Sequence, residues 1–120
     1  YVDSRELDDM VPTLLKLPKL SVDHLGMAKS GLSQVRRLAE GGVKIKASGF
    51  GRTEVNIEEA IKTLNETNPD ALMFGTDLPG TRSNRSFEPS DITNIVNALD
   101  SEEAVDKVFY QNARSFYNLP

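Results

Sequence analysis

Three short segments with the pattern of β-strands alternate with amphipathic helical segments along this chain, and each ends in a polar stretch that contains glycine. The strand segments are residues 19–23 and 43–47, in which apolar and polar residues alternate, and residues 71–74. Residues 71–74 are apolar throughout, which is typical of a strand buried on both faces. Because strand–helix–strand repeats form right-handed crossovers, this pattern predicts an α/β fold with a parallel sheet.

The helical segments are indicated by apolar residues that return to one face every three or four positions. Asn56 and Glu59 have the spacing of a capping box at the start of one helix, and Ser101 is a good N-cap for the last. Another helix is expected around Ile92, Ile95, Val96 and Leu99. The first two helices are expected at residues 5–17 and 31–40, and the third carries Ile57, Ala60, Ile61 and Leu64 on one face and is ended by Asn68-Pro69.

Composition excludes several classes of function. The 120 residues include no cysteine, so disulfides, thiolate zinc sites and a cysteine nucleophile are excluded. The net charge is −4 and the basic residues are scattered, which argues against nucleic-acid binding. No apolar run is long enough to cross a membrane. We therefore expect a cytoplasmic protein that acts on a small molecule, and a chain that lacks its natural start because no initiator methionine is present.

Polar residues cluster where each predicted strand ends. They are Asp23-His24-Leu25-Gly26, Lys46-Ala47-Ser48-Gly49 with Arg52 beyond it, and Gly75-Thr76-Asp77. In parallel α/β folds, ligands bind beyond the carboxyl ends of the strands. If the strands are parallel, these three groups meet at one rim and form a candidate site.

His24 and Asp77 are the strongest candidates at this rim. His24 is the only histidine, and a neutral imidazole can bind a metal or move a proton near pH 7. Asp77 follows an apolar strand, where a carboxylate can ligate a metal or act as a general base. The structural alternatives are that His24 only forms a hydrogen bond at a strand end and that Asp77 caps the following turn.

Lys46, Ser48 and Arg52 are weaker candidates, which we assign to substrate binding. Arg52 could hold a carboxylate or hydroxyl through its planar guanidinium, but a solvated arginine in a glycine-rich loop explains it equally well. Arg82 and Arg85 lie in a polar loop after Asp77, where solvated side chains are the better interpretation.

Four segments together resemble the amidohydrolase-related family. They match its DHLG strand end, its "vKlSG" strand, its "fGTDwP" strand and its closing helix with an Asn-Ala pair, in the family's order. Met27 stands where pyrone hydrolase-like members carry an arginine, and Leu78 replaces a common tryptophan. The matching segments are Leu20-Ser21-Val22-Asp23-His24-Leu25-Gly26, Val43-Lys44-Ile45-Lys46-Ala47-Ser48-Gly49, Phe74-Gly75-Thr76-Asp77-Leu78-Pro79 and Gln111-Asn112-Ala113-Arg114-Ser115-Phe116-Tyr117.

The resemblance implies a TIM (β/α)8 barrel, of which residues 1–120 would form a single C-terminal half-barrel domain with strands six to eight. Asp77 and His24 would be both catalytic residues and ligands of one divalent metal, such as zinc. Arg52 would sit where some relatives hold a substrate carboxylate. The family's first strand supplies a His-x-His pair that this chain lacks, and catalytic zinc needs about three protein ligands. We therefore expect the chain alone to be inactive and to need the missing N-terminal half or self-association.

The function that this resemblance implies is hydrolysis of a lactone or related cyclic ester of a small sugar or acid. Water would attack the carbonyl carbon, with Asp77 as general base and His24 as electrophile. One alternative is a metal-dependent decarboxylase of the same family. Another is a half-barrel without catalytic activity that assembles with a partner chain, since two half-barrels could cover each other's edges.

Overall fold

Three parallel strands form one sheet in the order β1-β2-β3 in the computed structural model, which describes residues 1–120. The strands are β1 (Ser21–Val22), β2 (Lys44–Ala47) and β3 (Leu72–Phe74). Val22 pairs with Ile45, and Ile45 pairs with Leu72, so strands that follow one another in sequence are neighbours in the sheet. The predicted α/β fold with a parallel sheet is confirmed.

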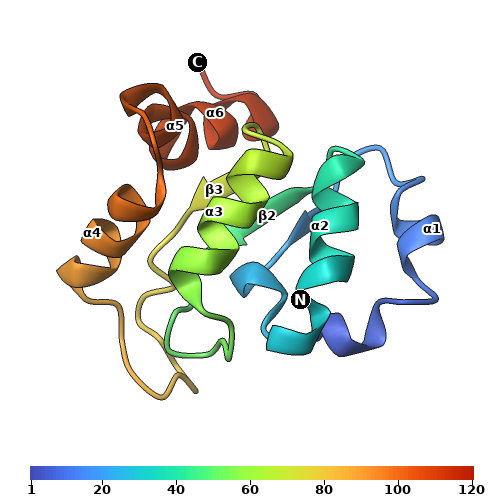
Figure 1. The fold of residues 1–120 in the computed structure, drawn as a ribbon, viewed down its shortest axis with the longest axis horizontal. Helices are drawn as coiled ribbons and strands as arrows, with labels where there is room; N and C mark the ends of the chain where they lie inside the picture. The colour runs from blue at the N-terminus through green and yellow to red at the C-terminus, as the bar shows by residue number, and fades with distance from the viewer.

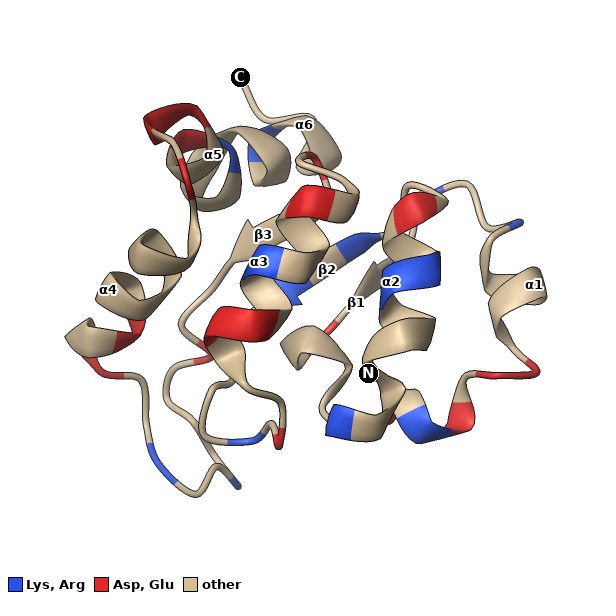
Figure 2. Ribbon diagram, viewed as in Figure 1, with Lys and Arg blue, Asp and Glu red and all other residues tan.

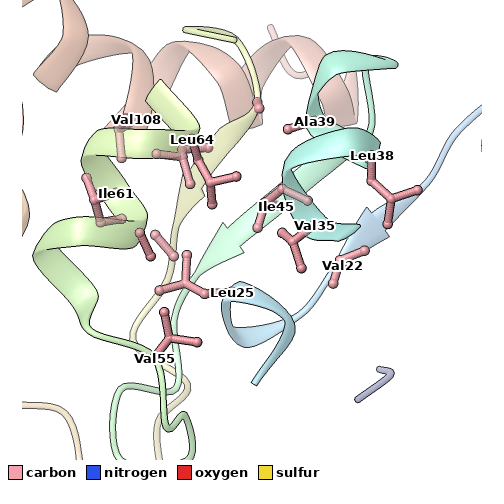
Figure 3. Packing of buried hydrophobic residues seen from close by; sticks show 14 of the residues in the cluster. Val22, Leu25, Val35, Leu38, Ala39, Ile45, Val55, Ile61, Leu64 and Val108 are labelled. Atoms are coloured by element: carbon pink, nitrogen blue, oxygen red, sulfur yellow. The ribbon is translucent and has the colours of Figure 1, made fainter. Parts of the chain in front are cut away.

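Helices α2 (Leu32–Glu40) and α3 (Ile57–Thr67) lie side by side over one face of this sheet (Figure 1). Successive strand residues point to opposite faces, so the paired positions Val22, Ile45 and Leu72 share the face that the helices cover. Figure 3 shows how strand and helix side chains interlock there, all of them nearly or fully buried. Those from the helices are Val35, Leu38, Ala39, Ile61 and Leu64.

The start of α3 follows the predicted capping chemistry in part. The Asn56 side chain accepts a hydrogen bond from the Glu59 backbone N–H at 3.0 Å, which satisfies one of the free donors of the first turn. At the other end, the helix stops at Thr67, before Asn68-Pro69. The bounds of α2 and α3 agree with the helices predicted from the sequence.

The remaining helices follow β3 on its outer side (Figure 1). They are α4 (Pro89–Ala98), α5 (Glu102–Asp106), the π-helical turn η4 (Lys107–Gln111) and α6 (Asn112–Tyr117). Ser101 caps α5 as predicted, because its hydroxyl accepts from the Ala104 N–H at 3.2 Å. The buried Asn112 side chain donates to the carbonyl groups of Pro69 and Leu72, which fixes α6 to strand β3.

The predicted helix at residues 5–17 is wrong. The structure has a short 3-10 turn, η1 (Ser4–Glu6), and one turn of helix, α1 (Val11–Leu14). Pro12 explains the break, since proline has no N–H and clashes with the carbonyl group of the preceding turn, so a helix can begin at proline but not run through it. Leu7 and Val11 are buried as the pattern predicted, whereas Leu15 is left exposed.

Charged residues of both signs are interspersed on α2 and α3 (Figure 2).

The first predicted strand is shorter than expected and is followed by two more short turns, η2 (His24–Gly26) and η3 (Lys29–Gly31). None of the helices is both long enough and apolar enough to cross a bilayer.

Candidate active site

The three polar groups predicted to meet at one rim do meet there. Turn η2 brings His24 to the end of β1, Ser48 follows β2, and Asp77 lies three residues beyond β3. Together with Lys46 they line one cavity of about 340 Å³. Arg52 borders a neighbouring hollow instead and reaches the cavity through its contact with Asp77.

His24 is held with one ring nitrogen toward Ser48 and the other toward Asp77. Its Nδ1 lies 3.0 Å from the Ser48 Oγ, and its Nε2 lies 3.8 Å from the Asp77 Oδ1. The ring also lies against the backbone of Gly49, where a Cβ atom would fall 2.4 Å from Nδ1. With 8% of His24 exposed, the imidazole is packed against Ser48 and Gly49 at the edge of the cavity that it lines with Asp77.

The backbone of η2 has an unusual conformation that aims His24 at the cavity. His24, Leu25, Gly26 and Met27 all have positive φ angles, from 54° to 76°. The Met27 N–H donates to the His24 carbonyl group at 2.9 Å, and the Leu25 side chain is fully buried in the core. Core packing and local hydrogen bonds therefore stabilise a turn that is costly for non-glycine residues.

Asp77 also has a positive φ of 59°, and its carboxylate contacts two of the candidate residues. Arg52 Nε donates to Asp77 Oδ2 at 2.5 Å, while Oδ1 faces His24. The hydrogen bond to the following turn comes from Thr76, whose hydroxyl accepts from the Leu78 N–H at 3.3 Å. The Asp77 carboxylate therefore faces the rim, and the side chain that caps the following turn is that of Thr76 and not that of Asp77.

Arg52 joins the loops that follow β2 and β3. Besides Asp77, its guanidinium donates to the Thr81 carbonyl group. A further arginine, Arg82, lines the hollow on the other side of Arg52. Arg85 does not belong to the site, because its guanidinium binds both oxygens of the buried Asp91 at 2.9 and 2.6 Å.

Lys46 pairs with a carboxylate that the sequence did not single out. Its Nζ lies 3.0 Å from Oδ1 of Asp23, the residue that follows the neighbouring strand β1. The hydrogen bond to Asp23 raises the pKa of Lys46. Burial raises the pKa of Asp23, but the hydrogen bond and charge of Lys46 outweigh this, so the pKa lies below its ordinary value. The strand register was the missing signal, since Val22 opposite Ile45 places the next residues, Asp23 and Lys46, opposite each other.

Tyr117 was also missed. It lies on α6 and lines the same cavity as His24 and Lys46. No local pattern relates the last helix to the end of β1, because their proximity depends on how α6 packs against β3.

Two of the candidate residues fit a divalent metal as part of a ligand set. His24 Nε2 and Asp77 Oδ1 face each other at 3.8 Å, and an imidazole nitrogen and a carboxylate oxygen are both donors that zinc takes in proteins. No group of three or more histidine, aspartate or glutamate side chains is arranged for a metal within the chain. The chain therefore offers two donors, and a third protein ligand would have to come from elsewhere.

Comparison with protein families matched residues 2–119 to the amidohydrolase family. Searches of curated proteins and of solved structures gave no match. Proteins of this family are hydrolases and related decarboxylases built on a TIM barrel, and they typically use a divalent metal. The match spans all three strands and every candidate residue. The chain belongs to the amidohydrolase family.

Proposed function

We propose that this chain supplies the His24–Asp77 part of the active site of a hydrolase that opens lactones or related cyclic esters of small sugars or acids. The observation that carries the proposal is the convergence of His24, Ser48 and Asp77 on one cavity at the carboxyl ends of three parallel strands. Active sites of TIM barrels lie at this end of the sheet.

In the proposed reaction, the Asp77 carboxylate accepts a proton from water as the water oxygen attacks the ester carbonyl carbon. His24 Nε2, 3.8 Å away, is placed to stabilise the negative charge that develops on the carbonyl oxygen. The ring C–O bond then breaks, and the alkoxide takes up the proton that Asp77 received. In a metal-dependent form of the enzyme, Asp77 and His24 Nε2 would instead hold a divalent ion that polarises the carbonyl group, so the Nε2–H donor belongs to the metal-free form.

The substrate is expected to be polar, because charged side chains surround the reacting groups. Lys46 lines the cavity, and Arg52 and Arg82 border the hollow beside it. Each could contact a hydroxyl or carboxylate of a small sugar acid. Lys46 and Arg52 are already paired with Asp23 and Asp77, so substrate contacts would have to share or replace these pairs.

We further propose that β1, β2 and β3 correspond to strands six to eight of a (β/α)8 barrel and that the chain needs an N-terminal half, or a second copy, to complete it. A sheet of three strands leaves two unpaired edges, and the edge of β3 is covered only at the Leu72 carbonyl group, by Asn112. The remaining metal ligands would lie in the complementary half.

The test is turnover of a panel of sugar lactones by the protein at its natural full length, with Asp77→Asn compared against Asp9→Asn. The asparagine amide keeps the shape of the Asp77 carboxylate but cannot accept the proton, so we expect kcat to fall about 100-fold or more. Asp9 is exposed and remote from the cavity, so its variant should match wild type. Unchanged turnover in Asp77→Asn would remove Asp77 from the mechanism, and release of CO₂ from carboxylated substrates would favour the decarboxylase.

A further inference from the structure

Ser48 lines the cavity, and its hydroxyl contacts the imidazole of His24. Only 4% of the residue is exposed, and the hydrogen bond of its Oγ is to the Nδ1 of His24, at 3.0 Å. No other side-chain or backbone group forms a hydrogen bond with this hydroxyl. This contact with His24 points to a role other than the substrate binding expected for Ser48 from the sequence, which stays a prediction.

The surroundings of His24 favour one of its two neutral tautomers. A carboxylate has only acceptor atoms, so Asp77 Oδ1 attracts an N–H at His24 Nε2 and repels a lone pair there. If Nε2 carries the proton, then Nδ1 is an acceptor, and the Ser48 hydroxyl must donate to it. This arrangement also gives the buried Ser48 hydrogen its only acceptor.

The position of the ring is fixed by the same contacts. Gly49 leaves room for the imidazole only because it has no side chain, since a Cβ atom there would lie 2.4 to 2.9 Å from three ring atoms. Gly49 prevents the imidazole from moving toward the loop after β2. The hydrogen bond with Ser48 fixes the rotation of the imidazole about its Cβ–Cγ bond. Without the hydroxyl, the ring could turn about this bond, and no partner at Nδ1 would favour one tautomer.

We propose that, in the metal-free protein, Ser48 is a positioning residue that donates to His24 Nδ1 and holds the imidazole as the Nε2–H tautomer. In the proposed hydrolysis, on which this role in catalysis rests, the Nε2–H is then the donor offered to the carbonyl oxygen of the substrate. Ser48 acts on the reaction through His24 and does not itself bind the substrate.

The structural part of the proposal is tested by ¹⁵N NMR of the imidazole in metal-free, full-length protein at about pH 8, where an ordinary histidine is neutral. The His24 signals are those that disappear in His24→Asn. We expect wild type and Ser48→Thr, which keeps the hydroxyl, to show a protonated Nε2 and an unprotonated Nδ1. Ser48→Ala should show a larger fraction of the Nδ1–H tautomer than wild type, because Asp77 is then the only one of the two groups left to favour Nε2–H. A protonated Nδ1 in wild type, or an unchanged spectrum in Ser48→Ala, would overturn the proposal.

Kinetics test the catalytic part. We expect Ser48→Ala to lower kcat about 10- to 100-fold, as is typical when the partner of an active-site histidine is removed, with KM changed less than about 2-fold. Ser48→Thr should restore kcat. A higher KM with normal kcat would instead show that Ser48 binds substrate. If no lactone is turned over by any variant, the proposed function fails, while the NMR result still decides the role of Ser48.

Discussion

Replacing Gly49 with alanine tests whether the backbone after β2 is shaped around the imidazole of His24. Gly49 has a φ of 61°, and an added Cβ would lie 2.4 Å from Nδ1, 2.7 Å from Cγ and 2.9 Å from Cε1 of His24. These atoms belong to a buried ring that cannot simply swing into solvent. Gly42→Ala is a matched control, because Gly42 also has a positive φ, 91°, but an added Cβ there has no atom within 4 Å.

The structure sets the expected magnitudes. A non-glycine residue at positive φ costs about 1–2 kcal/mol, and this strain should be the main effect at Gly42. At Gly49, displacement of the imidazole also breaks its hydrogen bond with Ser48 and leaves two buried polar atoms without partners, which costs about 1–3 kcal/mol more. We therefore expect Gly49→Ala to lower the free energy of unfolding by about 2–5 kcal/mol. The reduced flexibility of the unfolded chain offsets both variants similarly and cancels in the comparison.

Urea denaturation of both variants, each with and without His24→Ala, measures these terms. Removal of the imidazole should remove the steric part, so in the His24→Ala background Gly49→Ala should cost no more than Gly42→Ala. The free energy that the contact with His24 adds is the difference between the costs of Gly49→Ala in the two backgrounds. Equal costs for Gly49→Ala in both backgrounds would refute the view that Gly49 is shaped around His24.

Two further predictions concern groups outside the site. Burial raises the pKa of Asp91, but the hydrogen bond and charge of Arg85 outweigh this and hold that pKa below 3.8 in the folded protein. The ion pair should therefore stabilise the fold fully above pH 3.8 and lose its effect as the pH falls through the lower pKa of the folded state. Arg85→Ala should lower the free energy of unfolding by about 2 kcal/mol at pH 7, measured by urea denaturation, and should flatten this acid dependence. Asn112→Ala removes both hydrogen bonds of the buried amide, including the one to the edge carbonyl of Leu72, and should cost about 2–4 kcal/mol. Its control, Asn94→Ala on the exposed face of α4, should stay within about 0.5 kcal/mol, and equal effects would contradict the role given to Asn112.

The parts of the fold that were predicted correctly depend on local patterns. Strand β3 is an apolar run, α2 and α3 have one apolar face each, and Asn56 and Ser101 cap helices in the usual way. Alternation of these elements was enough to infer the parallel sheet, because the handedness of strand–helix–strand units leaves few other arrangements. The prediction of the first helix was wrong because Pro12 interrupts a segment whose apolar residues otherwise follow the helical period.

The sequence predicted which residues lie at the rim but not how their side chains contact one another. Rim position brought His24, Ser48 and Asp77 together, since it follows from strand order alone. The contact of Arg52 with Asp77 could not be predicted, because it depends on how the loop after β2 crosses toward the loop after β3. The pairing of Lys46 with Asp23 is an intermediate case, because it follows from the strand register once that is known.

Backbone conformation gives a second argument for the site, beside the side-chain contacts. His24 and Asp77 have φ angles of 54° and 59°, a conformation that costs each about 1–2 kcal/mol. Positive φ alone does not mark function, since Asn118 adopts it as an ordinary cap at the end of α6. His24 and Asp77 differ because neither ends a helix and both strained turns direct their side chains toward the same point, with 3.8 Å between Nε2 and Oδ1. Two separate turns that converge on one cavity in this way support the proposal that the reaction uses both groups.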